Sequence, residues 1–94
     1  MTVYIQYPDG AEARAKELRE RLTRDLAAGY TAPGTEKIRQ APARDQIRIY
    51  RDADQARASA LATALGMADA QIVNLSRSYR NLPANTLEVW LKAP

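Results

Sequence analysis

A chain of 94 residues has room for one domain, and its lack of cysteine and histidine excludes several kinds of active site. Without them the chain can form no disulfide, no thiolate site and no Ser-His-Asp or Cys-His arrangement, and it lacks the commonest metal ligand. A hydrophobic fraction of 46% predicts one folded domain over residues 1–94, while a net charge of +3 is too small for a dedicated polyanion-binding patch.

Carboxylate chemistry has little support either, because no acidic residues pair at a meaningful spacing. We therefore expect a binding domain rather than an enzyme, with no catalytic residue, metal or cofactor. The longest apolar run is too short to span a bilayer, so no membrane partner is expected. If the chain is complete, the absence of a signal peptide predicts the cytoplasm. If it was cut from a longer protein, the periplasm stays open.

The first third of the chain predicts a strand and then a helix. Residues 3–7 are rich in β-formers and indicate a strand. Asp9, with Glu12 three residues later, is a capping-box pattern, and residues 11–28 predict a helix that Gly29 ends. Its apolar stripe comprises Ala11, Ala15, Leu18, Leu22 and Leu26.

The opposite side of this predicted helix is charged. Glu17 precedes Arg21 by four residues, and Glu20 precedes Arg24 by four, which is the order that favours ion pairs along a helix. This pattern predicts a solvated face that serves solubility.

The middle of the chain predicts two strands and a second helix. Residues 30–38 predict a strand interrupted by Pro33-Gly34, and residues 46–50 alternate strictly as a strand does. Asp52, with Gln55 three residues later, predicts a second capping box. The stripe of this helix would comprise Ala53, Ala56, Ala60, Leu61, Ala64 and Leu65.

The last quarter predicts two more strands, at residues 71–75 and 86–91, joined by a polar loop. The resulting order is β-α-β-β-α-β-β. It predicts an α+β, ferredoxin-like split βαβ fold, an antiparallel sheet of four to five strands with two helices on one face.

Strand alternation then assigns the two faces of the sheet. The side chains expected to face the helices are Val3, Ile5, Tyr7, Ile47, Ile49, Leu87, Val89 and Leu91. The uncovered face would carry the candidate binding residues Tyr4, Gln6, Arg48, Tyr50, Glu88 and Trp90, with Arg77, Tyr79 and Arg80 in the last loop.

Several interpretations of this face stay open. Among the functional ones, contact with a protein partner, a neighbouring domain of the same polypeptide or a second copy in a homodimer leads, because Trp and Tyr favour interface centres. The alternatives are stacking of aromatic rings on a glycan and ordinary amphipathic strands without a ligand. RNA binding ranks third, since the order matches RRM domains but residues 46–50 lack glycine and carry one outward aromatic. An unrecognised carboxylate enzyme ranks fourth.

The sequences Val-Tyr-Ile-Gln at 3–6 and Ile-Arg-Ile-Tyr-Arg at 47–51, with Gly29-Tyr30 between them, resemble the small SPOR-like and LytR C-terminal-type domains. The resemblance covers residue 3 to about residue 75. It implies a four-stranded antiparallel sheet with two helices, to which residues 86–92 are an addition. For SPOR domains it implies that the sheet face binds peptidoglycan glycan strands, here through Tyr4, Gln6, Arg48 and Tyr50.

The stretch from Gly29 to Glu36 and the last strand also resemble uncharacterised modules appended to bacterial caspase-like proteases. This second resemblance implies an accessory interaction role.

Overall fold

The computed structural model describes residues 1–24, 29–79 and 84–94. The elements are β1 (Thr2–Tyr7), α1 (Glu12–Arg24), β2 (Thr35–Lys37), β3 (Gln46–Ile49), a 3-10 turn (Asp52–Asp54), α2 (Gln55–Ala64), β4 (Gln71–Asn74) and β5 (Thr86–Trp90). The predicted order of strands and helices is confirmed. The predicted helix positions 25–28, with Leu26, and the candidate residue Arg80 lie outside the described residues.

The five strands form one sheet in the order β2-β1-β5-β3-β4. β1 pairs in parallel with β2 and β5, and β3 pairs in parallel with β4, whereas β3 and β5 are antiparallel. The α+β class is confirmed, but the prediction of an antiparallel sheet is wrong, because the sheet is mixed. Each helix connects parallel neighbours, as a crossover connection requires, and β5 lies between the two strand–helix–strand units.

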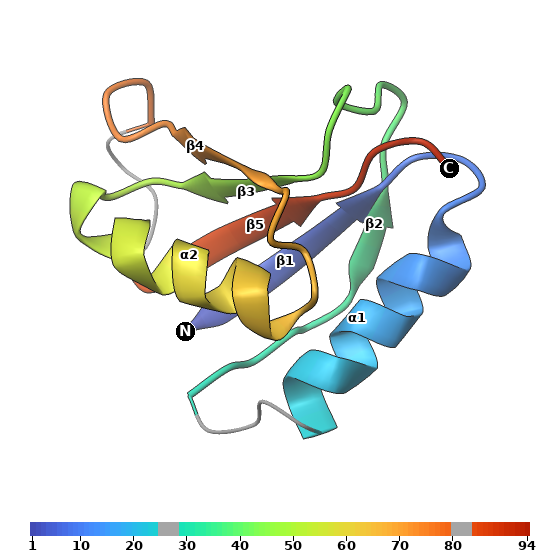
Figure 1. The fold of residues 1–94 in the computed structure, drawn as a ribbon, viewed down its shortest axis with the longest axis horizontal. Helices are drawn as coiled ribbons and strands as arrows, with labels where there is room; N and C mark the ends of the chain where they lie inside the picture. Colours follow the sequence, from blue (N-terminus) through green and yellow to red (C-terminus); the bar gives the residue numbers. More distant parts are fainter. Residues whose placement is uncertain (25–28, 80–83) are drawn as a thin grey trace.

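Both helices cover the same face of the sheet (Figure 1). The strand side chains predicted to face them are buried to within 1% exposure: Val3, Ile5, Ile47, Ile49, Leu87, Val89 and Leu91. Tyr7 is partly buried against the same core. Helix α1 contributes Ala15, Leu18 and Leu22. The alternation in the sequence therefore assigned the core face of β1, β3 and β5 correctly.

Helix α2 packs in a different rotation from the one predicted. Its buried side chains are Ala58, Leu61, Ala62 and Leu65, whereas Ala53, Ala56, Ala60 and Ala64 are exposed. The prediction is right for the two leucines and wrong for those four alanines. Because alanine occurs on every side of this helix, the two leucines decide which face packs against the sheet.

Asp52 does not cap α2, contrary to the predicted capping box. Neither the 3-10 turn nor α2 has a side-chain hydrogen bond at its N-cap. The Oδ1 atom of Asp52 instead accepts hydrogen bonds from Asn74 Nδ2 at 2.7 Å and Ser76 Oγ at 3.0 Å. These bonds tie the start of the helical segment to the end of β4.

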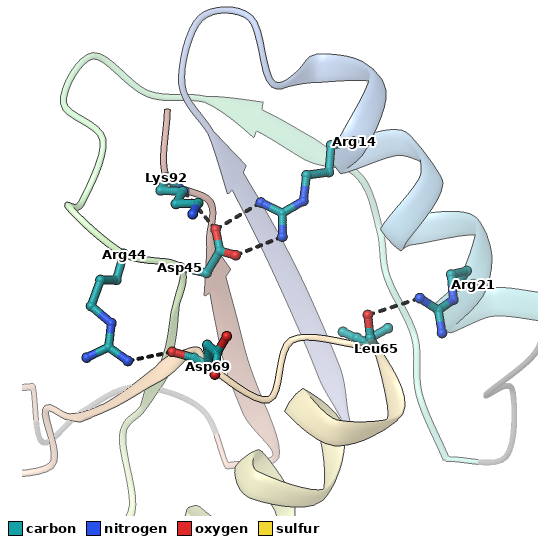
Figure 2. Close-up of polar contacts among 7 residues, drawn as sticks. All are labelled: Arg14, Arg21, Arg44, Asp45, Leu65, Asp69 and Lys92. Atoms are coloured by element: carbon teal, nitrogen blue, oxygen red, sulfur yellow. Dashed lines mark hydrogen bonds and ion pairs between the residues drawn. The ribbon is translucent and has the colours of Figure 1, made fainter. Parts of the chain in front are cut away.

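Asp45 joins three separate parts of the chain. Arg14 of α1 donates from Nη1 and Nη2 to the two carboxylate oxygens at 2.9 and 2.7 Å. The backbone N–H of Lys92 donates to Oδ1 at 3.0 Å (Figure 2 shows the bonds from Arg14 and Lys92). The carbonyl of Asp45 also accepts the N–H of Gln71 at 2.8 Å. The residue before β3 thus holds α1, the start of β4 and the chain after β5.

Arg21 of α1 caps the end of α2, so the charged side of α1 is more than the solvated face predicted. Its Nη1 and Nη2 atoms donate to the carbonyls of Leu65 at 3.0 Å and Ala64 at 2.8 Å (Figure 2 shows the first). The last carbonyls of a helix lack partners within the helix, and a cation there also meets the negative end of the helix dipole. Arg21 therefore links the two helices.

We expect Arg21→Gln to lower the free energy of unfolding by about 1 kcal/mol, which is typical of a partly exposed hydrogen bond to a charged donor. A domain of this size should then lose about 4–8 °C in Tm. Arg57→Gln is the matched control, because Arg57 lies on α2, is exposed and has no hydrogen bond or ion pair within the described residues. Equal Tm values for the two variants would contradict the capping role.

Candidate functional site

The face of the sheet opposite the helices carries most of the predicted binding residues. Strand register places them in two adjacent rows. One row runs Glu36, Gln6, Trp90, Gln46 and Gln71, and the next runs Tyr4, Glu88, Arg48 and Val73. We call this surface, with Tyr50 and Tyr79 at its end, the open face. Within the described part of the chain, no helix covers it (Figure 1).

Glu88 is the centre of a polar network on the open face. Its Oε1 atom accepts hydrogen bonds from the Tyr50 hydroxyl and from Trp90 Nε1, the latter at 3.0 Å. Tyr79 packs edge-on against Tyr50, with ring centroids 6.0 Å apart and an interplanar angle of 83°. The last loop thereby adds an aromatic ring, 54% exposed, to the surface that the strands form.

Tyr50 should keep its proton at a pH where an ordinary tyrosine, with a pKa of about 10, has lost it. Burial raises the pKa of Tyr50, and the hydrogen bond to Glu88 raises it further. Because the folded state favours the neutral hydroxyl, its contribution to stability is present below pH ~10 and is lost as pH rises through the higher folded value. Tyrosinate absorbance, recorded after a rapid pH jump and before the chain unfolds, should show a component that appears only at higher pH, and Tyr50→Phe should remove it. Identical titration curves for wild type and Tyr50→Phe would contradict this prediction.

Arg48 lies over the ring of Trp90. The guanidinium carbon is 3.7 Å from the centroid of the ring, which is a cation–π contact. Its Nε donates to Gln46 Oε1 at 3.1 Å. Although Arg48 and Glu88 are direct cross-strand neighbours, no ion pair joins them in the described structure. The arginine is held by stacking instead.

Two open hollows flank this network. One is lined by Ile38, Arg39, Gln40, Arg48 and Trp90. The other, beside β2, is lined by Tyr4, Ile5, Gln6, Pro33, Gly34, Thr35 and Glu36. Both are surface depressions rather than enclosed cavities.

The predicted site residues differ in how far they can contact a partner. Tyr4 is 42% exposed, whereas Gln6 is only 7% exposed, so Gln6 offers little surface. Arg77 is exposed but lies near Asp52, and hydrogen bonds from Asn74 and Ser76, with the charge of Arg77, lower the pKa of that carboxyl. No hydrogen bond or ring contact joins Arg77 to the open face in the described structure.

Several residues of the open face and its hollows were not predicted from the sequence. Gln46 is in phase with Arg48 on β3, so the alternation contained the signal for it. The residues of the hollow beside Trp90, at positions 38–40, follow a short strand at the other side of β1. Their proximity depends on strand order, which a local pattern does not carry.

Within residues 1–24, 29–79 and 84–94, no group of three or more His, Cys, Asp or Glu side chains could hold a metal ion. No helix in the same residues is long and apolar enough to cross a bilayer. Comparison of the chain with protein-family models, curated proteins and solved structures finds no match.

Proposed function

We propose that the chain is a non-catalytic binding module that recognises a protein partner through the open face. The observation that carries the proposal is the presence of three exposed or half-buried tyrosines and one tryptophan on a side of the sheet that the helices leave bare: Tyr4, Tyr50, Tyr79 and Trp90. A few residues carry most of the binding energy at protein interfaces, and tyrosine, tryptophan and arginine are enriched among them.

The pairing of the strands supports the same proposal. Sheets in which all strands are parallel are usually covered on both faces. This sheet is mixed, because β3 and β5 are antiparallel, but its other three pairings are parallel and the helices cover one face. A partner seated on the open face would cover the second face.

Tyr50 and Trp90 on the open face are also held in place by contacts within the chain. Tyr50 and Trp90 share one carboxylate oxygen of Glu88, and the Trp90 ring is packed beneath Arg48. Side chains that are already ordered lose less conformational entropy when a partner binds. This arrangement suits a recognition surface.

The experiment compares partner capture and self-association of the wild-type chain with those of Trp90→Ala, Tyr50→Ala and Tyr4→Ala. Each aromatic should act as an interface anchor, so its loss should weaken binding by roughly 30-fold or more. Arg57→Ala, on the helix side, is the control and should bind as wild type does. Tyr4→Ala removes a side chain without a hydrogen bond in the described structure, so it tests the surface even if another variant fails to fold. Unchanged profiles for all three would end the proposal.

A glycan strand is the second candidate ligand, favoured by the hollow beside β2. The exposed ring of Tyr4 forms one wall, and Thr35 and Glu36 supply polar groups around it. An aromatic ring with adjacent hydrogen-bonding groups can hold the face and hydroxyls of a sugar. Co-sedimentation with purified peptidoglycan sacculi, lost in Tyr4→Ala, is the expected result for this candidate. If the wild-type chain stays in the supernatant when the sacculi are pelleted, glycan binding is excluded.

A further inference from the structure

We propose that the hollow lined by Ile38, Arg39, Gln40, Arg48 and Trp90 binds a carboxylate side chain, Asp or Glu, of an acidic protein partner. The inference rests on the proposed function, since it names the chemistry that the partner presents to one part of the open face. It is supported by the orientation of Arg48 and by the lack of an ion pair at either arginine of the hollow within the described residues.

Arg48 is held in one orientation, and two of its guanidinium nitrogens have no hydrogen-bond partner in the described structure. The contact with the Trp90 ring and the hydrogen bond from Nε to Gln46 Oε1 together hold the guanidinium in place. Within the described residues, the Nη1 and Nη2 atoms of Arg48 have no hydrogen-bond or ion-pair partner. A guanidinium presents its donors as a planar fork that matches the two oxygens of a carboxylate. The free edge of Arg48 is such a fork.

Arg39 brings a second positive charge to the same hollow. Its side chain is exposed, and it too has no ion pair within the described residues. Ile38 and Trp90 form the apolar part of the wall. Interactions between charges are stronger beside apolar walls than in open water. The hollow therefore combines an oriented fork, a second, exposed cation and a partly apolar wall.

A protein carboxylate fits this hollow better than a nucleic acid does. Proteins that bind single-stranded nucleic acid offer bare aromatic faces for base stacking, but Arg48 already covers one face of Trp90. Glu88, on the adjacent row of the same surface, would repel a run of phosphates. A single carboxylate docked between Arg39 and Arg48 brings one negative charge near Glu88, whereas a run of phosphates brings several.

The experiment titrates the isotope-labelled chain with a capped hexapeptide that carries two glutamates and, separately, with the same peptide carrying two glutamines. NMR follows the Nε–H signal of Arg48 and the indole N–H signal, which belongs to Trp90 because the chain has one tryptophan. We expect the glutamate peptide to shift both signals saturably, more weakly at high salt, and the glutamine peptide to leave them in place.

Three variants sharpen the test. Arg48→Lys keeps the charge but loses the fork, so it should weaken glutamate-peptide binding about tenfold. Arg39→Gln, which removes an exposed side chain, should weaken it several-fold. Arg57→Gln removes the same charge from α2 and should have no effect.

The inference is overturned if the glutamate peptide shifts neither signal, if both peptides shift them alike, or if Arg57→Gln weakens binding as much as Arg39→Gln. It is also overturned if a single-stranded oligonucleotide shifts these signals at lower concentration than the glutamate peptide, a result that would assign the hollow to phosphate. Partner capture that is lost in Trp90→Ala but unchanged in Arg48→Lys and Arg39→Gln would retain the proposed function and reject the carboxylate site. Capture insensitive to every open-face variant would reject both.

Discussion

Leu87→Ala should lower the free energy of unfolding by about 3–4 kcal/mol, the usual cost of removing a fully buried leucine side chain. Leu87 is 0% exposed and lies on β5, which pairs with both β1 and β3 at the centre of the sheet. A domain of 94 residues has a total stability of roughly 5–14 kcal/mol. The substitution should therefore remove a large share of that stability and lower the Tm by at least ~12 °C.

Urea denaturation followed by circular dichroism measures this loss, and Val73→Ala is the matched control. Val73 lies on the edge strand β4 and is half-buried on the open face. It should cost less than about 1 kcal/mol, since a partly exposed side chain leaves little cavity. A loss for Leu87→Ala no larger than that for Val73→Ala would contradict the placement of β5 at the centre of the sheet.

Asp45→Asn should cost about 2 kcal/mol, because the charged acceptor of three hydrogen bonds becomes a neutral amide. The expected loss of stability is modest because the Arg14 side chain is 40% exposed, so water screens part of the ion pair. Asp69→Asn is the control, since Asp69 is exposed and accepts the hydrogen bond from Arg44 through its backbone carbonyl.

The cost of Asp45→Asn should also depend on pH. Burial alone would raise the pKa of Asp45, but the hydrogen bonds from Arg14 and the Lys92 backbone outweigh burial and lower it. The folded state thus favours the carboxylate, and this contribution is present above the unfolded pKa of about 3.9 and is lost as pH falls through the lower folded value. The stability difference from wild type should be constant between pH ~7 and ~5 and shrink below pH ~4. A stability difference between Asp45→Asn and wild type that is the same at neutral and strongly acidic pH would contradict the role of the charged Asp45 carboxylate.

The alternation of side chains along each strand predicted which residues face the helices and which do not. Val3 and Ile5 are buried on β1 while Tyr4 between them is exposed, and the same rule holds on β3 and β5. A period of two is a local property of the chain, so a single sequence carries it. The grouping of Tyr4, Arg48, Glu88 and Trp90 followed from it.

Strand order and direction were not predictable in the same way. Because β5 pairs with both β1 and β3, residue 88 lies beside residues 4 and 48. The alternation of residues 86–91 does not predict which strands lie next to them. The alternation does not predict strand direction either, because parallel and antiparallel strands share the same period. The choice depends on how the two helices pack on one face, which is a property of the whole fold.

Competition among polar partners explains the remaining differences. Asp52 has the spacing of a helix cap, but Asn74 and Ser76 take its carboxylate. Arg21 has the spacing of an ion pair with Glu17, but the last carbonyls of α2 take its guanidinium. Each preferred partner is distant in sequence, so spacing along one helix could not reveal it.

The most direct test of the recognition surface is photo-crosslinking from two sides of the folded chain in its native cells. A photoreactive phenylalanine analogue replaces Tyr4 on the open face in one variant and Ala60, an exposed residue of α2, in the other. We predict a discrete crosslinked partner from position 4, displaced by excess wild-type chain but not by Trp90→Ala, and none from position 60. A partner that crosslinks from position 60 and not from position 4 would show that the helix side is the binding surface.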